Sequence, residues 1–291
     1  MIHRILFPTD GSAFAERALP TAAAIAAAQG AEIFLVRVTA PPAWLTMDGV
    51  AGDGISPELY QQVTDELHEE AHRNLDRLAG ILRAQDIKAS VRLLEGSTYA
   101  ALLDYEAQVE PELVIMATHG HTGLARFALG SVADVMVREG TAPVLLVRSF
   151  GKEVVSLESA LVPLDGSALA EQSLPLVETL AGKPLQRVFL LSVVDTPQER
   201  ADAWSYLIQI VLRLANTPLH LDFDVQVGRV VERIAERARR MDLVMMATHG
   251  RGGFDRLRHG SVATAMVAES PAPVLLVRAR AEAASAGALA A

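Results

Sequence analysis

The sequence predicts an α/β protein built from two tandem repeats of one domain, each a five-stranded parallel sheet with helices on both faces. Short apolar runs bounded by turn residues alternate with amphipathic stretches, which is the pattern of βαβ units. Hydrophobic residues make up 51% of the 291 residues and aromatic residues only 5%, as is typical of strands buried on both faces. The length allows about two domains, each with its own core.

The duplication is visible in recurring segments. Three pairs share one offset: Met116–Gly120 with Met246–Gly250, Gly130–Ala133 with Gly260–Ala263, and Ala142–Arg148 with Ala272–Arg278. Pro8–Ala13 recurs as Pro163–Ala168 with a longer offset. Such a long period indicates a duplicated globular domain, because solenoid repeats are only about 20 to 50 residues long. We expect a first repeat at residues 1–150, a second at 156–280, a short linker near 149–156 and a disordered Ala-rich tail at 281–291.

The strands are expected where an apolar run ends at turn residues, with helices between them. In the first repeat these runs are Ile5–Pro8, Ile33–Val38, Lys88–Leu94, Leu113–Ala117 and Val144–Val147. In the second repeat they are Leu161–Pro163, Arg187–Val193, Leu221–Val227, Leu243–Ala247 and Val274–Val277. The early segments recur at a longer offset than the later ones. The first repeat therefore has more residues than the second between its second and fourth strands. Part of them form the Pro-, Gly- and Asp-rich stretch Ala40–Pro57, which predicts a mobile loop, either a lid or idle surface.

Composition excludes several classes of protein. A net charge of −9 disfavours a nucleic-acid partner, because such binding depends on clustered Lys and Arg. The chain has no Cys, which removes disulfides, thiolate metal sites and cysteine nucleophiles. No apolar run is long enough to span a membrane, and the first residues are typical of a strand rather than a signal peptide. We therefore expect a cytoplasmic protein without a membrane or nucleic-acid partner.

One motif suggests a metal site but is discounted. His68-Glu69-Glu70-Ala71-His72 fits the H-E-x-x-H pattern of zinc hydrolases. The apolar stripe of that helix is expected to be Val63, Leu67, Ala71, Leu75, Leu78 and Leu82, which places both histidines beside it, toward solvent. The second repeat has no counterpart, and Glu95 is the one remote candidate for a third ligand. A zinc site is not predicted.

Polar residues follow the first and fourth strands of both repeats. In open α/β sheets, ligands bind beyond the carboxyl ends of the strands. Asp10-Gly11-Ser12 follows the first strand, and the segment after the fourth strand leads to Gly130-Ser131, which opens a helix. A glycine at a helix N-terminus suits phosphate, and a carboxylate suits a ribose hydroxyl or an adenine amine. If the two strands are neighbours, these groups form a nucleotide pocket.

Each motif also has a purely structural interpretation. Ser131-x-x-Asp134 resembles a helix-capping box, and Asp10-Gly11 is an ordinary turn dipeptide. Recurrence of both motifs at strand ends in two repeats favours the pocket.

These residues resemble the universal stress protein family in its tandem-domain form, over nearly the whole chain. ATP-binding members carry Gly-x2-Gly-x9-Gly-Ser/Thr after the fourth strand. This chain reads Ala117-x2-Gly120-x9-Gly130-Ser131 and Ala247-x2-Gly250-x9-Gly260-Ser261, with alanine for the first glycine in both repeats. The family's Pro-x-Asp motif is matched by Pro8-Thr9-Asp10 and Pro163-Leu164-Asp165.

The resemblance implies two nucleotide sites. Asp10 and Asp165 would meet the adenosine, Val38 and Val193 the base, and Gly120, Gly130, Ser131, Gly250, Gly260 and Ser261 the phosphates. Neighbouring positions complete the sites: Pro8, Thr9, Met116, Ala117, Val132, Pro163, Met246, Ala247 and Val262. The implied ligand is ATP, with participation of Mg²⁺ and the alternatives ADP and AMP left open. The first repeat is favoured, because Thr9 adds a hydroxyl where the second repeat has Leu164.

The family also implies a Rossmann-like fold of the adenine nucleotide alpha hydrolase type, with strand order 3-2-1-4-5. Its domains pair through their fifth strands, here Pro143–Val147 and Pro273–Val277 within one chain, and association into a homodimer is left open. Three functions follow. The favoured one is a nucleotide-binding stress regulator, without dedicated catalysis, that is read by a regulatory protein partner. The others are a nucleotide-free interaction module, indicated by Ala117 and Ala247, and a slow ATP hydrolase or nucleotidyl-transfer enzyme.

Overall fold

The computed structural model describes residues 1–40, 57–118, 129–148, 157–249 and 261–279. Several sequence predictions fall outside these ranges: the linker, the tail, nearly all of the Ala40–Pro57 loop, and Gly120, Gly250 and Gly260. The chain divides into two compact units, Met1–Met136 with Leu145–Ser156, and Val137–Val144 with Leu157–Ala291. Among the described residues, no helix is both long and apolar enough to cross a membrane.

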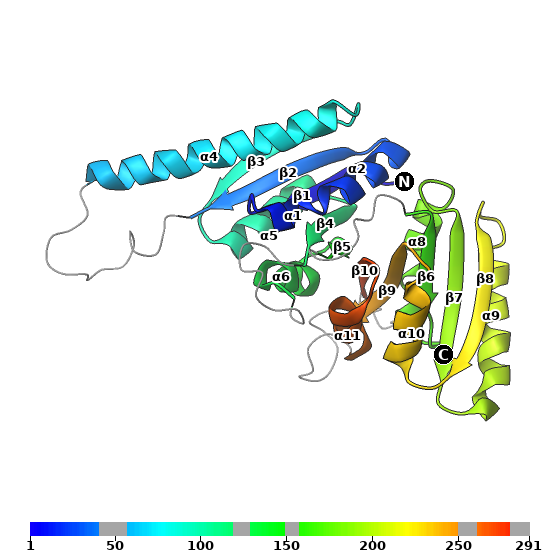
Figure 1. The fold of residues 1–291 in the computed structure, drawn as a ribbon. Helices are drawn as coiled ribbons and strands as arrows, with labels where there is room; N and C mark the ends of the chain where they lie inside the picture. Colours follow the sequence, from blue (N-terminus) through cyan, green and yellow to red (C-terminus); the bar gives the residue numbers. More distant parts are fainter. Residues whose placement is uncertain (41–56, 119–128, 149–156, 250–260, 280–291) are drawn as a thin grey trace, which may run out of the picture. The chain divides into compact units, whose positions relative to one another are not determined.

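The first repeat alternates strands and helices as predicted (Figure 1). Its elements are β1 (Arg4–Pro8), α1 (Ala13–Glu16), α2 (Leu19–Gln29), β2 (Glu32–Thr39), α4 (Pro57–Arg83), β3 (Ala89–Glu95), α5 (Thr98–Val109), β4 (Leu113–Ala117), α6 (Ser131–Glu139) and β5 (Val144–Val147). The strand order is β3-β2-β1-β4-β5. β1 lies parallel to β2 on one side and to β4 on the other, which confirms that the first and fourth strands are neighbours.

The second repeat has the same order, β8-β7-β6-β9-β10. Its elements are β6 (Ser159–Pro163), α7 (Ala168–Glu171), α8 (Leu174–Leu180), β7 (Arg187–Val194), a 3₁₀ turn (Pro197–Glu199), α9 (Arg200–Leu214), β8 (His220–Val227), α10 (Val230–Ala238), β9 (Leu243–His249), α11 (Ser261–Glu269) and β10 (Val274–Ala279). The strands agree with the predicted runs to within a few residues. The predicted fold class, two Rossmann-like domains of parallel strands and helices, is confirmed.

The core of the first repeat is centred on the strands β1, β4 and β5. All side chains of β4 and β5 are buried, and Ile5, Leu6 and Phe7 of β1 are fully covered. Strands covered on both faces need continuous apolar sequence, which explains why they are the clearest runs in the chain. The outer strand β3 is only half-buried along most of its length.

The additional residues of the first repeat lengthen a helix as well as a loop. α4 has 27 residues, whereas α9, the helix at the same place in the second repeat, has 15. Both helices pack on the outer pair of strands of their own repeat, α4 on β2 and β3 and α9 on β7 and β8. The sequence prediction assigned part of the insertion to the loop and did not recognise the longer helix.

The predicted stripe of α4 is largely correct. Ala71, Leu75, Leu78 and Leu82 are buried, whereas Val63 and Leu67 are half-buried. His72 is exposed as predicted, but His68 is half-buried and its Nε2 lies 3.6 Å from Oε1 of Glu95. Within the described residues no group of three His, Asp or Glu side chains is placed to hold a metal ion. The structure gives no support for a zinc site on α4.

Candidate functional site

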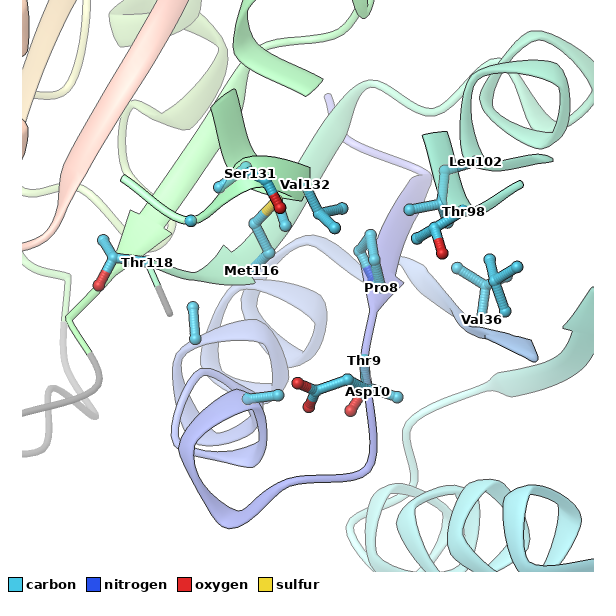
Figure 2. Close-up of a pocket in the computed structure, with 15 residues that line it drawn as sticks. Pro8, Thr9, Asp10, Val36, Thr98, Leu102, Met116, Thr118, Ser131 and Val132 are labelled. Carbon is cyan, nitrogen blue, oxygen red and sulfur yellow. The ribbon is translucent and has the colours of Figure 1, made fainter. Parts of the chain in front are cut away.

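A cavity of about 300 Å³ opens at the carboxyl ends of β1, β2 and β4 (Figure 2). Every predicted site residue of the first repeat that lies in the described part of the chain lines this cavity: Pro8, Thr9, Asp10, Val38, Met116, Ala117, Gly130, Ser131 and Val132. In Figure 2, Ser131 and Val132 lie on one side of Pro8, and Thr98, Leu102 and Val36 lie on the other. Residues of six elements, β1, α1, β2, α5, β4 and α6, therefore line one cavity.

The turn that carries Asp10 is held by its own side chains. Oδ1 of Asp10 accepts a hydrogen bond from the Ser12 amide at 2.9 Å, and Oγ1 of Thr9 accepts one from the Gly11 amide at 3.1 Å. The Ser12 hydroxyl accepts one from the Ala15 amide at 3.1 Å and caps α1. The structural interpretation of Asp10-Gly11 as a turn is therefore correct, and the same turn places the Asp10 side chain in the wall of the cavity.

The opposite wall is the N-terminus of α6. The Gly130 amide donates to the Thr118 carbonyl at 2.8 Å, and the Gly130 carbonyl accepts the Asp134 amide at 2.9 Å as the helix begins. The first amides of a helix have no intrahelical acceptor, and those of Ser131, Val132 and Ala133 belong to residues that line the cavity. This end of the helix also has a positive potential. The wall therefore offers donors to an anion.

The two alanines that replace the motif glycine both lie in strands. Ala117 is the last residue of β4, and Ala247 lies within β9. Extended backbone accepts any L-residue without strain, so neither methyl group distorts its strand. Ala117 is only 8% exposed and lines the cavity, so its methyl group takes up a small part of the cavity.

The remaining lining is mainly apolar. Among the described lining residues, Asp10 is the one ionisable side chain, and the hydroxyls of Thr9, Thr98, Thr118 and Ser131 supply the other polar side-chain groups. Such a lining fits a ligand with a flat apolar part and hydroxyl groups.

Six lining residues were missed by sequence reasoning: Ala15, Val36, Thr98, Leu102, Thr118 and Ala133. Val36 could have been predicted from Val38, because residues two apart in a strand lie on the same face of the sheet. Thr98 and Leu102 are one helical turn apart on α5, and no motif marks that helix.

The second repeat reproduces the turn. Oδ1 of Asp165 accepts hydrogen bonds from the Ser167 amide at 3.0 Å and from the Ser167 hydroxyl at 2.6 Å. Pro163 and Val193 are half-buried, and Met246 and Ala247 are 7% and 9% exposed. Ser261 begins α11 and Val262 follows it, half-buried. These residues occupy the same elements as their counterparts in the first repeat, whereas Gly250 and Gly260 lie outside the described residues.

Three substitutions make the equivalent site of the second repeat more apolar. Leu164 stands where the first repeat has Thr9 and is buried, with 3% exposure. Leu191 stands where the first repeat has Val36, and each accepts the same backbone hydrogen bond at 2.9 Å, from Leu164 and Thr9 respectively. Val230 and Thr98 are the first residues of α10 and α5. The second repeat thus loses two hydroxyls and gains aliphatic bulk.

In each repeat one glutamate connects the short helix after the first strand to the longer helix on the outer strands by hydrogen bonds. Glu16 of α1 accepts hydrogen bonds from Asn74, at 2.9 Å, and from Arg77 of α4. Glu171 of α7 accepts them from Tyr206 and Arg213 of α9, both at 3.2 Å. Burial, with the adjacent Glu171 carboxylate, raises the pKa of the Tyr206 phenol well above its usual value, so it remains a neutral donor. The duplication has preserved this link with different donors.

Comparison with known proteins agrees with this architecture. A family model described as the universal stress protein family matches residues 1–148 and 157–278. A universal stress protein of Mycolicibacterium smegmatis is 27% identical and covers 95% of this chain and 97% of its own length. One of Synechocystis sp. is also 27% identical, covering 94% and 99%. The crystal structure of a universal stress protein from Archaeoglobus fulgidus has a TM-score of 0.75 at 19% identity, covering 94% of this chain and 98% of that one, which is a likeness of fold.

Proposed function

The chain belongs to the universal stress protein family, and on this premise we propose that it is a stress-response regulator that binds an adenine nucleotide, ATP, without dedicated catalysis. The observation that carries the proposal is the cavity of the first repeat, which unites the Asp10 turn and the α6 N-terminus. An adenosine phosphate needs an apolar slot, an acceptor for its hydroxyls and donors for its phosphates, and these walls supply all three.

The proposed placement follows from the lining. Val36, Val38 and Leu102 form the apolar side, where the adenine ring would lie. Asp10 would accept from ribose or adenine, and the amides at the start of α6 with the Ser131 hydroxyl would meet the phosphates. Gly120, Gly250 and Gly260 remain predicted contacts outside the described residues. The same walls would accept ADP or AMP, and a Mg²⁺ ion would accompany the phosphates of ATP.

We further propose that the first repeat is the competent one. Thr9 and Thr98 line its cavity, and the second repeat has Leu164 and Val230 in their places. Loss of the two hydroxyls removes hydrogen-bond partners for a polar ligand. Leu191 also has a larger side chain than Val36, its counterpart in the first repeat, and leaves less room for a ligand. The second repeat would then provide an interaction surface and would not bind nucleotide.

Pairing of the two repeats through β5 and β10 remains a proposal. These strands stand at the end of the order in their own repeats. A bare apolar edge strand promotes aggregation, and a tandem partner would cover it permanently. A regulatory protein partner would bind the nucleotide-bound and the nucleotide-free forms of this protein with different affinities.

Alanine substitution of the two aspartates tests the proposal. Asp10→Ala and Asp165→Ala both remove the hydrogen bond from the serine amide to the aspartate of the turn, 2.9 Å and 3.0 Å long, and Asp165→Ala also removes the bond from the Ser167 hydroxyl. Asp165→Ala therefore controls for loss of the turn. We expect Asp10→Ala to abolish ATP retention on gel filtration and Asp165→Ala to retain it. Phosphate release from ATP, measured alongside, separates the regulator from a slow hydrolase. Absence of ATP retention by the wild-type protein would leave the nucleotide-free interaction module, favoured by the alanines at positions 117 and 247.

A further inference from the structure

The Asp10 turn of the first repeat is supported by an arginine of β2. Arg37 lies between Val36 and Val38, which line the cavity, so its own side chain points to the opposite face of the sheet. On that face its guanidinium packs against the backbone of Gly11. Its Cζ and Nη2 atoms lie 3.0 Å and 3.5 Å from the position that a Cβ atom on Gly11 would occupy. The arginine therefore contacts the turn on the side away from the cavity.

Arg37 is itself fixed by the long helix α4. Its Nη1 and Nη2 atoms donate to Oε1 of Glu70, at 3.4 Å and 3.2 Å. The Arg37 side chain is only 11% exposed, whereas that of Glu70 is 60% exposed. An ion pair with so exposed a partner contributes little to the free energy of unfolding. The main effect of the pair is to hold a long side chain in one conformation against the turn.

Glu70 belongs to a row of polar side chains on α4. Glu70, Asn74 and Arg77 are four and three residues apart, so they lie on one face of the helix. Asn74 and Arg77 donate to Glu16, the last residue of α1, and α1 begins three residues after Asp10. The row therefore contacts the chain on both sides of the turn backbone, through the arginine of β2 and through α1.

The second repeat lacks the arginine. Ser192 follows Leu191 in β7 as Arg37 follows its neighbour in β2, and it is 4% exposed. Nothing lies within 4 Å of the Cβ position on Gly166. The Asp165 side of this turn is exposed, whereas the turn of the first repeat is half-buried. The same turn thus forms without an arginine, so the fold does not require one.

We propose that Arg37 is a positioning residue of the nucleotide site, which holds the Asp10 carboxylate where it accepts a hydrogen bond from the nucleoside. The inference rests on the proposed function, because it concerns affinity at the same cavity. A carboxylate that is already held in place loses less conformational entropy when a ligand binds. Arg37 is not one of the residues that line the cavity, so it acts through the turn.

Linkage makes α4 sensitive to the nucleotide. If the contact between Arg37 and α4 raises the affinity for nucleotide, bound nucleotide stabilises that contact by the same free energy. The middle of α4, residues 70–77, contacts no residue of the cavity lining through an ion pair or hydrogen bond in the described part of the chain. We nevertheless expect its amide exchange to slow when ATP is bound.

Two neighbouring glutamates of α4 provide a matched test. Glu69 and Glu70 each pair with one arginine at 3.2 Å, but only the arginine of Glu70 contacts the turn. Arg37→Ser, which copies the second repeat, and Glu70→Gln should each weaken ATP binding by roughly threefold to tenfold. Glu69→Gln should bind ATP as the wild type does, and urea unfolding confirms that all three variants fold.

The outcomes of this titration separate the inference from the proposed function. Wild-type affinity in Arg37→Ser and Glu70→Gln would overturn the inference and leave nucleotide binding established. An equal loss in Glu69→Gln would also overturn it, because any ion pair on α4 would then have the same effect. Absence of ATP binding by the wild-type protein would refute the proposed function, and the inference with it.

Adenosine separates positioning from charge. A positive charge at position 37 would also attract phosphates over a distance. If Arg37 positions Asp10, Arg37→Ser lowers the affinity for adenosine and for ATP by the same factor, because Asp10 would meet the nucleoside part of both. A loss for ATP alone would show that Arg37 acts through its charge and would overturn the proposal.

Hydrogen exchange of the full chain supplies the reciprocal measurement. At equal ATP occupancy, exchange at residues 70–77 should slow in the wild-type protein and slow less in Arg37→Ser. Equal slowing in the two proteins would show that Arg37 does not connect the site to α4, and would overturn the proposal.

Discussion

The guanidinium of Arg37 lies over Gly11, with its Nη1 atom 2.5 Å from the position that a Cβ atom on Gly11 would occupy. Gly11 follows Asp10 directly and has a φ of +80°, which L-residues rarely adopt. The other terminal nitrogen of Arg37 lies 3.2 Å from Oε1 of Glu70 on α4. The turn that positions the Asp10 carboxylate is thus confined by a side chain that also links β2 to the long helix.

This relationship predicts different effects of the same substitution in the two repeats. Gly166 has a φ of +83° but nothing within 4 Å of its Cβ position. Gly166→Ala should cost about 1 kcal/mol through backbone strain alone, and Gly11→Ala more than this by less than about 1 kcal/mol, because the flexible end of Arg37 must also shift from its pairing with Glu70. Urea unfolding measures both losses, and only Gly11→Ala should weaken ATP binding. Equal losses of stability would show that Arg37 does not confine the turn.

Ala117→Gly tests the effect of the methyl group in the cavity. The residue ends β4 in extended conformation, so the alanine does not strain the backbone, and removing the methyl group only enlarges the cavity. We expect ATP affinity to change by less than about tenfold, or 1.4 kcal/mol. Ala247→Gly in β9 is the control and should leave affinity unchanged. A much larger gain with Ala117→Gly would mean that the alanine had nearly closed the site.

Thr98→Val tests a residue that no motif identified. Valine has nearly the shape of threonine, so the exchange removes the hydroxyl from the cavity wall and little else. Affinity for ATP should fall by roughly threefold to tenfold if that hydroxyl meets the ligand. The reverse exchange, Val230→Thr, at the first residue of α10, should have no effect on affinity. Unchanged binding by Thr98→Val would show that the Thr98 hydroxyl does not contact the ligand.

The free energy of unfolding should fall at acid pH, in part because the Glu112 carboxylate becomes protonated. Its carboxylate accepts the Arg4 amide at 2.7 Å and the His3 amide at 3.3 Å, and thereby fixes β4 beside β1. Burial opposes its ionisation, but these amides and the Arg4 charge outweigh burial and lower the pKa of Glu112. A carboxyl with a lowered pKa in the folded state stabilises the fold above its unfolded pKa, and this contribution is lost as the pH falls through the folded pKa.

The variant Glu112→Gln should therefore be less stable than the wild type near neutral pH, by less than about 1 kcal/mol because the side chain is partly solvated. The difference should begin to shrink as the pH falls below about 4.5, the ordinary pKa of a glutamate, and should continue to shrink toward about pH 3 as the pH passes the lowered pKa of the folded Glu112. Urea unfolding at the two pH values measures it. A constant difference across this range would show that the charge of Glu112 does not contribute.

The parts of the fold that sequence predicted best are those with continuous burial. β1, β4 and β5 are short, almost wholly apolar and bounded by turn residues, so their pattern has few alternatives. The cavity residues on these strands and at the start of α6 followed from the rule that ligands lie at carboxyl strand ends. Residues such as Leu102 did not, because helix periodicity predicts a buried face without showing whether that face meets the sheet or a ligand.

The outer helices show the same limit. In α9, apolar residues lie on two faces, and the sequence does not indicate that Leu207 would be buried while Ile208 would be exposed. Only the position of β7 and β8 decides this. In α4, the apolar stripe predicted the helix, but the length of the helix depended on how the additional residues of the first repeat divide between helix and loop.

Calorimetric titration of ATP into nucleotide-free protein, with and without Mg²⁺, measures whether the cavity of the first repeat binds nucleotide. We predict micromolar binding with one ATP per chain, because this cavity keeps the hydroxyls that Leu164 and Val230 replace in the second repeat. Two equivalent sites would contradict the assignment to the first repeat. No heat and no thermal stabilisation at millimolar ATP would contradict nucleotide binding itself.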